Sequence, residues 1–254
     1  MNVVVLVKYV PDPQGTPELG EDFLVKREGT EGALDPGDEY AVEAALQVAG
    51  GDGEVALVSM GPEVALTAIR RGLSMGAHRG VLVSDPSLRG ADVLATARVL
   101  AAVVRRAPVD LVLAGVESTD GYTGTLPMTV AELLGLPAAT FARKLDVVDG
   151  TLRIERQTEG GFDVVEAPLP ALATVTASAA EPRYPTLKGI MQAKQKPLEQ
   201  LSLTDLGVEP AEVTGTQRVT DVRPAAEKGS GEIVQAGEDG AGRIVQFLAE
   251  AKVI

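Results

Sequence analysis

The sequence predicts an α/β fold built on an open, mostly parallel twisted sheet with helices on both faces. Up to about residue 135, short runs rich in β-branched residues alternate with amphipathic stretches. The short runs are continuously apolar, which is typical of strands buried on both faces of a parallel sheet. Alternating strands and helices form βαβ units with right-handed crossovers, and these place helices on both faces.

The expected elements follow one another regularly. Buried strands are predicted at Asn2–Val7, Glu54–Ser59, Gly80–Ser84 and Val109–Gly115. Helices are predicted at Asp38–Val48, Glu63–Ser74, Asp92–Arg106 and Met128–Leu134. Asp35 and Pro36 before the first helix and Gly50 and Gly51 after it are typical start and stop signals. Because ligands of such sheets bind beyond the carboxyl ends of the strands, near the switch point, we expect the functional site there.

The pattern changes near residue 145. Leu152–Gln157 and Phe162–Ala167 flank a turn at residues 158–161 and predict a β-hairpin, and Leu172–Thr176 predicts one more strand. Residues 205–235 are acidic and poorly patterned, and a last amphipathic helix is expected at Gly242–Lys252. A tail of this type packs poorly on its own domain, so we expect either disorder in isolation or an arm that embraces another chain.

The composition excludes several classes of function. The chain has 36 acidic and 23 basic residues, and its net charge of −13 disfavours binding to nucleic acid or to an anionic membrane. No apolar run approaches the roughly 20 residues that span a bilayer, so no membrane insertion is expected. The first residues, MNVVVLVKYVPDP, lack the features of a signal peptide. A cytoplasmic location is therefore predicted.

Groups for catalysis are scarce. His78 is the single histidine and there is no cysteine, which excludes multi-histidine metal sites and a cysteine–histidine dyad. The position of His78 before an apolar run favours an ordinary strand-end histidine. The sequence contains no Gly-x-Ser-x-Gly elbow, no Gly-x-Gly-x-x-Gly fingerprint and no Walker A loop. We therefore expect neither catalytic residues nor a metal site.

The segment Ala114–Leu134 is the strongest candidate for a binding site. It follows an apolar strand, opens a helix, and contains Gly115, Gly121 and Gly124 together with the hydroxyls of Ser118, Thr119, Thr123, Thr125 and Thr129. Free N–H groups at a helix start attract an anion, so this composition suits a phosphate. A long surface loop capped by Thr and Gly is the alternative reading. Leu34–Glu39 and Ser59–Pro62 would line the same cleft.

Several long motifs resemble the electron-transfer flavoprotein β subunits. Ile154–Thr174 is similar to the family signature, with matches at Arg156, Glu159, Gly160, Gly161 and Pro170. The opening VLVKYVPD, the segment Ala68–Gly80, the segment Glu117–Gly124 and the segment Glu181–Lys196 are similar as well. The resemblance covers residues 1–200 and weakens beyond them.

This resemblance implies a sheet like that of adenine nucleotide α-hydrolase-like folds and an obligate heterodimer with an α subunit. FAD would be held mainly by the α subunit, and this chain would bind a structural AMP. The AMP contacts carried over from the family are Leu6, Asp35, Pro36, Gly37, Asp38, Met60, Gly115, Ser118, Thr119, Asp120, Gly121, Tyr122, Thr123, Gly124 and Thr125.

The resemblance also implies a recognition loop, Glu181–Lys196, that docks on flavin-containing dehydrogenases such as the acyl-CoA dehydrogenases of fatty acid oxidation. FAD would accept their electrons and pass them towards a quinone reductase. The expected contact residues are Arg183, Tyr184, Leu187, Ile190 and Met191, with Lys188, Lys194 and Lys196 nearby. We accordingly predict a nucleotide-binding domain at residues 1–200, with the hairpin at 151–168 and the recognition loop at 181–196. Residues 201–254 would form a C-terminal arm and helix that pack on the α subunit.

The chain departs from the family pattern at three places. Pro13 and Gly37 stand where some members have aromatic residues near the flavin. Gln157 follows Arg156 where some relatives have an acidic residue, and residues 125–127 are less polar than in part of the family. Two alternatives stay open: an electron-bifurcating member with FAD in place of AMP, and a free-standing ATP-binding stress-type protein.

Overall fold

The fold was analysed in a computed structural model that describes residues 1–12, 14–15, 17–27, 29, 31–223, 231, 233–234, 237 and 239–254. The described chain forms two units, Met1–Thr220 and Asp221–Ile254. The second unit contains helix α7 (Gly240–Glu250), close to the predicted Gly242–Lys252. No helix in the described ranges is both long enough and apolar enough to cross a membrane.

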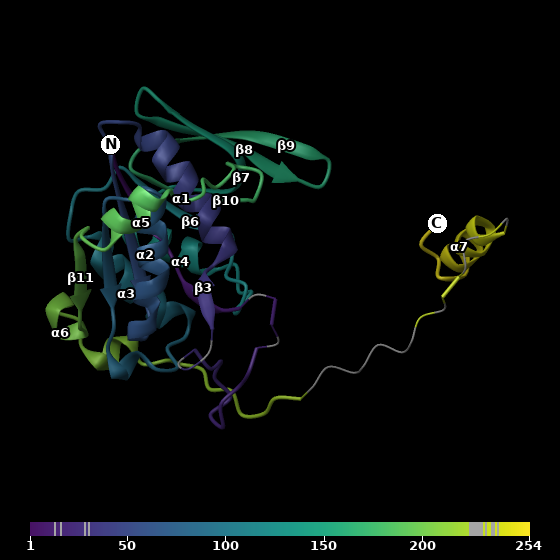
Figure 1. The fold of residues 1–254 in the computed structure, drawn as a ribbon, viewed down its shortest axis with the longest axis horizontal. Coiled ribbons are helices and arrows are strands. Elements are labelled where there is room, and N and C mark those ends of the chain that lie inside the picture. Colours follow the sequence, from purple (N-terminus) through teal and green to yellow (C-terminus); the bar gives the residue numbers. More distant parts are fainter. Residues whose placement is uncertain are drawn as a thin grey trace. The chain divides into compact units, whose positions relative to one another are not determined.

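The first unit contains a nine-stranded sheet in the order β11-β5-β4-β1-β6-β10-β7-β8-β9 (Figure 1). Its strands are β1 (Asn2–Leu6), β4 (Glu54–Met60), β5 (Arg79–Val83), β6 (Leu111–Gly115), β7 (Ala138–Val148), β8 (Thr151–Thr158), β9 (Gly161–Pro168), β10 (Ala171–Val175) and β11 (Leu198–Leu201). Pairing is parallel from β11 to β7, and β8 and β9 continue the sheet in antiparallel register. The predicted α/β class and mostly parallel sheet are confirmed.

Helices cover both faces of this sheet. They are α1 (Pro36–Ala49), α2 (Leu66–Met75), α3 (Val93–Val104), α4 (Leu126–Leu134), α5 (Leu187–Ala193) and α6 (Leu203–Leu206), with short 3-10 turns η1 (Glu63–Ala65), η2 (Pro86–Leu88) and η3 (Pro210–Val213). Val3 and Val5 of β1 pack in one buried cluster with residues of α1 and α2, whereas Val4 and Leu6 pack in a second cluster with α3 and α4. This alternation buries the central strand on both sides.

The hairpin prediction is confirmed, and β8 and β9 each extend one residue beyond both expected ends. The predicted helices and strands appear within a few residues of their expected bounds. The helix expected at Glu63–Ser74 begins instead as the turn η1 and continues as α2. Asp92 caps α3 and lies outside it, because its side chain accepts a hydrogen bond from the Ala95 N–H.

Several elements were not predicted. Strand β7 was missed because its two buried positions in the sheet, Ala139 and Ala142, are small, and its outer part is charged. A two-stranded sheet of β2 (Tyr9–Pro11) and β3 (Gly32–Leu34) and the edge strand β11 were missed as well. The recognition loop contains the helix α5, which Thr186 caps by accepting from the Gly189 N–H.

Strand order places a switch point beside β1. The chain runs from β1 outward through β4 and β5 and then returns by way of α3 to β6, on the other side of β1. At a switch point, the connections from two neighbouring strands run in opposite directions. A crevice then opens at the carboxyl ends of those two strands. The carboxyl ends of β1, β4 and β6 are therefore where a ligand is expected.

Candidate functional site

The residues predicted for nucleotide binding gather at the carboxyl edge of the sheet. Leu6 ends β1, Met60 ends β4 and Gly115 ends β6, and all three strands run parallel in neighbouring positions. Asp35 caps α1, whose first residues are Pro36, Gly37 and Asp38. We call the segment that follows β6, Gly115–Thr125, the phosphate loop. The structure thus brings together segments that lie more than a hundred residues apart in the chain.

Asp35 fastens the phosphate loop to the start of α1. Its side chain is fully buried. One carboxyl oxygen, Oδ1, accepts from the Gly37 N–H at 2.8 Å and so caps the helix. The other, Oδ2, accepts from the N–H of Thr119 at 2.7 Å and from its hydroxyl at 2.8 Å. A single carboxyl group therefore fixes a helix start and the loop opposite it.

Asp38 fastens the same helix to the central strands. Its Oδ2 accepts from the Lys8 N–H at 2.7 Å, and the Gly115 N–H also donates to this carboxyl. Burial, together with the neighbouring charge of Asp35, raises the pKa of Asp38 well above its ordinary value. Gly115 packs closely against this carboxyl, since a Cβ on it would lie 3.1 Å from Asp38 Oδ1. A larger residue at position 115 would therefore require Asp38 and the Gly37 backbone to shift slightly.

Asp120 is the third anchored acid of the site. Its Oδ1 accepts from Lys8 Nζ at 2.6 Å, and its Oδ2 pairs with the Arg27 guanidinium. Burial alone would raise the pKa of Asp120, but the two nearby cations outweigh that effect and lower it. Lys8 Nζ also donates to Ser118 Oγ at 3.1 Å. One ion cluster thereby joins the residues that follow β1, the segment before β3 and the phosphate loop.

The middle of the phosphate loop has the backbone form of an anion site. Tyr122 and Gly124 adopt positive φ values of 48° and 60°. Within the described residues, no acceptor receives a hydrogen bond from the backbone N–H of Thr123 or Gly124, and no side chain caps the start of α4 after Thr125. Free N–H groups ahead of a helix start favour a bound anion. The three acids nearby, Asp35, Asp38 and Asp120, already accept hydrogen bonds from donors of the chain. The N–H groups of Thr123 and Gly124 therefore stay available, and these donors fit a phosphate group.

The hydroxyls of the phosphate loop divide into two groups. Those of Ser118 and Thr119 are hydrogen-bonded to Lys8 and Asp35 and hold the loop in place. Thr123, Thr125 and the ring of Tyr122 are exposed, the last by 68%. Gly121 lies close to one of the anchoring hydroxyls, since a Cβ on it would be 3.1 Å from Ser118 Oγ. The anchoring residues thus come first in the loop, and the exposed residues follow them.

The residues predicted for partner binding lie away from this edge. Lys196 Nζ donates to the carbonyl oxygens of Leu73 at 2.9 Å and Ala77 at 2.6 Å, at the end of α2. Since α2 leads back to the start of β5, the recognition loop lies near the amino ends of the strands. Tyr184, Leu187, Ile190 and Met191 are exposed there by 90%, 83%, 46% and 71%. The loop thus displays a group of apolar side chains, and its docking role stays a prediction.

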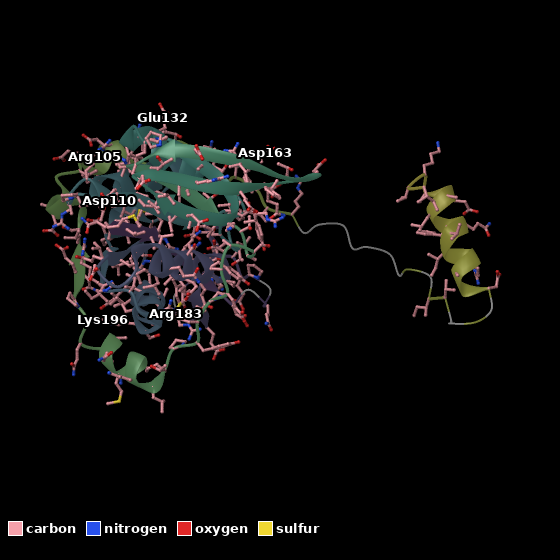
Figure 2. All side chains as sticks on the ribbon, turned by 90° about the horizontal axis from the view of Figure 1, so that it is seen from above. Arg105, Asp110, Glu132, Asp163, Arg183 and Lys196 are labelled. Atoms are coloured by element: carbon pink, nitrogen blue, oxygen red, sulfur yellow. The ribbon has the colours of Figure 1, made fainter. Side chains whose placement is uncertain are left out.

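Arg183 differs from the other recognition-loop residues. Its guanidinium forms a two-point contact with Glu43 of α1, at 2.6 Å and 2.8 Å, and its backbone N–H also donates to Glu43. This contact lowers the pKa of Glu43 and raises that of Arg183. Figure 2 labels Arg183 and Lys196 beside the green segment that carries α5. Both cations hold the loop on its own domain.

Sequence reasoning missed Lys8, Arg27 and Glu43. Lys8 had a usable signal, because a cation directly after a central buried strand lies at the carboxyl edge of the sheet. Arg27 lies in a segment without periodicity, and Glu43 looks like any polar residue of an amphipathic helix.

Of the two positions expected near the flavin, Gly37 is the second residue of α1 and Pro13 lies outside the described residues. Gln157 pairs with Phe162 across the hairpin.

Comparison with known proteins gives a consistent result. The family described as "Electron transfer flavoprotein domain" matches residues 22–206. The electron transfer flavoprotein subunit beta of Mycobacterium tuberculosis (strain H37Rv) is 40% identical over 264 aligned positions, covering 100% of this chain and 99% of its own. The protein of that name from Clostridium acetobutylicum is 34% identical, with 100% of both chains covered.

A third relative has a different name. The caffeyl-CoA reductase-Etf complex subunit CarD of Acetobacterium woodii is 34% identical, again with 100% of both chains covered. The match to the family spans both the phosphate loop and the recognition loop. Together with full-length similarity to named β subunits, it settles the family: this chain belongs to the electron transfer flavoproteins, as a relative of their β subunits.

Proposed function

We propose that this chain is the β subunit of a heterodimeric electron carrier and holds a structural AMP at the carboxyl edge of its sheet. The observation that carries the proposal is the phosphate loop, which the buried acids Asp35 and Asp120 fix with the N–H groups of Thr123 and Gly124 left open. The family membership supports a nucleotide in this position. Leu6 and Met60 would contact its adenosine part, and residues 115–125 its phosphate.

FAD is held mainly by the α subunit in this proposal, and this chain contributes one wall. The chain supplies no catalytic residue of its own; it binds, positions and shields. The bound FAD supplies the redox chemistry by accepting electrons from a dehydrogenase and passing them towards a quinone reductase. Of the predicted C-terminal arm, residues 201–254, the part that packs on the α subunit in this proposal is the second unit, because Leu203 and Val213 are already buried in the core of the first unit. In α7, Ile244, Phe247 and Leu248 share one side at helical spacing and are apolar, which suits such packing.

The recognition loop docks on flavin-containing dehydrogenases, such as the acyl-CoA dehydrogenases of fatty acid oxidation. Support comes from Leu187, whose side chain is 83% exposed although it is apolar and belongs to a capped helix. Replacing Leu187 by alanine should raise the KM for the dehydrogenase reaction about tenfold, because burying one leucine stabilises a complex by roughly 1.5–3 kcal/mol. FAD content, AMP content and melting temperature should stay at wild-type values. Wild-type kinetics at subsaturating concentration would remove this loop from the mechanism.

The cofactor assignment is tested by co-expression with the α-subunit gene, purification of the heterodimer, acid release and chromatography of the nucleotides. We expect one FAD and one AMP per heterodimer, and no flavin absorbance in the isolated β chain. A heterodimer without AMP and with a single FAD would contradict the proposed role of the phosphate loop.

An electron-bifurcating role is the second candidate, favoured by the similarity to the CarD subunit of a caffeyl-CoA reductase-Etf complex. In that case a second FAD would occupy the place that AMP takes in the first candidate. The same nucleotide measurement separates the two candidates, since two FAD and no AMP per heterodimer would select bifurcation. A free-standing ATP-binding stress-type protein receives no support from the family matches.

A further inference from the structure

The recognition loop is fastened to the body of the domain at both of its ends. Glu43 of α1 holds the first end, at Arg183, and Arg70 of α2 holds the second end, at residues 193–196. The exposed apolar side chains of the loop all lie between these two anchors. A short segment tied at both ends has few conformations left, which sets this loop apart from a free surface connection.

The first anchor is stronger than an ordinary surface ion pair. Glu43 is 4% exposed as a residue although it is charged, and it accepts three hydrogen bonds from Arg183. Gln47 donates a further hydrogen bond to Glu43 at 3.0 Å. A fork-shaped guanidinium that meets both oxygens of one carboxylate fixes orientation as well as distance. The backbone at residue 183 is thus held directly against α1.

The second anchor is made of crossed contacts between α2 and the end of α5. Arg70 donates to the carbonyl oxygens of Ala193 and Lys196, the latter at 3.1 Å. In return, Lys196 Nζ donates to the carbonyl oxygens of Leu73 and Ala77. Gly189 packs on the same helix so closely that a Cβ on it would lie 2.6 Å from the Ser74 carbonyl oxygen. These contacts therefore fix the position of α5 on α2.

We propose that Glu43 and Arg70 are positioning residues for partner docking: they hold the recognition loop so that Leu187 is presented to the dehydrogenase in one arrangement. The inference rests on the proposed docking function and adds residues of α1 and α2 that do not themselves face the partner. A loop that is ordered before binding loses less conformational entropy in the complex, which increases affinity without any new contact. Loosening either anchor should therefore weaken docking.

The test uses the α–β heterodimer and an acyl-CoA dehydrogenase reduced by its own acyl-CoA, with the rate of heterodimer flavin reduction measured against heterodimer concentration. Glu43→Gln removes the charge but keeps the side-chain shape, and Arg70→Met removes the donors of the second anchor. Each should raise KM about twofold to tenfold at unchanged kcat, since ordering a side chain on binding has an effect of this size. Glu199→Gln is the matched control, because Glu199 forms a two-point contact at 2.9 Å and 3.0 Å with Arg106, which follows α3. It should leave KM unchanged.

A positioning role predicts a result in double variants that a general loosening of the fold does not predict. In a chain that already carries Leu187→Ala, the anchor variants should have little additional effect on KM, because the side chain they position is gone. If Leu187→Ala raises KM while both anchor variants behave like Glu199→Gln, the positioning role is wrong and docking stands. An anchor effect of equal size with and without Leu187 would also overturn it. If Leu187→Ala itself leaves KM unchanged, the proposed docking function is refuted, and the positioning role that rests on it is refuted as well.

Discussion

Replacing Asp35 by alanine would release the phosphate loop from α1 and test the central contact of the candidate site. Asp35 has no exposed surface, and its two oxygens accept three hydrogen bonds, one from Gly37 and two from Thr119. Alanine removes all three acceptors at once. The loop would then keep, at the start of α1, the contact between the Gly115 N–H and the Asp38 carboxyl but lose both contacts of Thr119.

The expected magnitude follows from these contacts. Losing a helix N-cap destabilises a protein by about 1 kcal/mol. Leaving the Thr119 N–H without its acceptor adds about 1–3 kcal/mol, depending on how much water reaches it. Asp35→Ala should therefore reduce the free energy of unfolding by about 2–4 kcal/mol. AMP retention should fall as well, because the loop that binds the phosphate is no longer held.

Asp35→Asn separates the two roles of this side chain. Asparagine caps helices as well as aspartate does, so its carbonyl oxygen can keep the Gly37 contact. Its NH2 group would then face the Thr119 N–H, so that backbone contact is lost, although the Thr119 hydroxyl can turn and accept a hydrogen bond. We expect Asp35→Asn to be less destabilising than Asp35→Ala but to release AMP to a similar extent.

The assay combines urea unfolding of the heterodimer with acid release of AMP after gel filtration. Thr119→Val is the control, since it removes only the hydroxyl donor and keeps the backbone contact; it should destabilise by about 1 kcal/mol or less. The reasoning is refuted if Asp35→Ala and Asp35→Asn both retain stoichiometric AMP. Unfolding curves for Asp35→Ala that coincide with the wild type would refute the structural part alone.

Three other predictions concern separate parts of the chain. Gly124 has a φ of 60°, so Gly124→Val should strain the phosphate loop and lower both AMP retention and the melting temperature; unchanged values in both assays would make the loop a surface connector. Leu152 of β8 is fully buried, so Leu152→Ala should lower the free energy of unfolding in urea by about 2–5 kcal/mol, and a loss well below this range would contradict the packing of the hairpin on the core. Arg183 lowers the pKa of Glu43 in the folded chain, so the wild type should be more stable than Glu43→Gln wherever Glu43 is ionised. This difference in the free energy of unfolding should be complete above the unfolded-state pKa of about 4.3, and it should disappear as the pH falls through the lower pKa of the folded chain. Urea unfolding of both proteins from pH 7 downward checks this, and a difference independent of pH would argue against the ion pair.

Local patterns made much of the fold predictable. The apolar runs at β1, β4, β5 and β6 are unbroken because these strands are covered on both faces, and that property is visible in any short window of sequence. The hairpin was predictable because its turn and its strand ends are adjacent in the chain. Strand β7 was not, because what makes it a strand is its pairing with β10 and β8 and not an apolar pattern of its own.

The candidate site divides in the same way. Composition and residue order were enough to predict a glycine- and hydroxyl-rich loop that follows a buried strand and opens a helix, because both are local properties. The folded structure was needed to identify the residues that hold that loop: Lys8 reaches Asp120 across 112 positions of the chain, and Asp35 reaches Thr119 across 84. It also decided that Arg183 turns to Glu43, 140 positions away. Such contacts depend on how helices and strands pack on one another, and a carboxyl or ammonium group has no sequence period that reveals its partner.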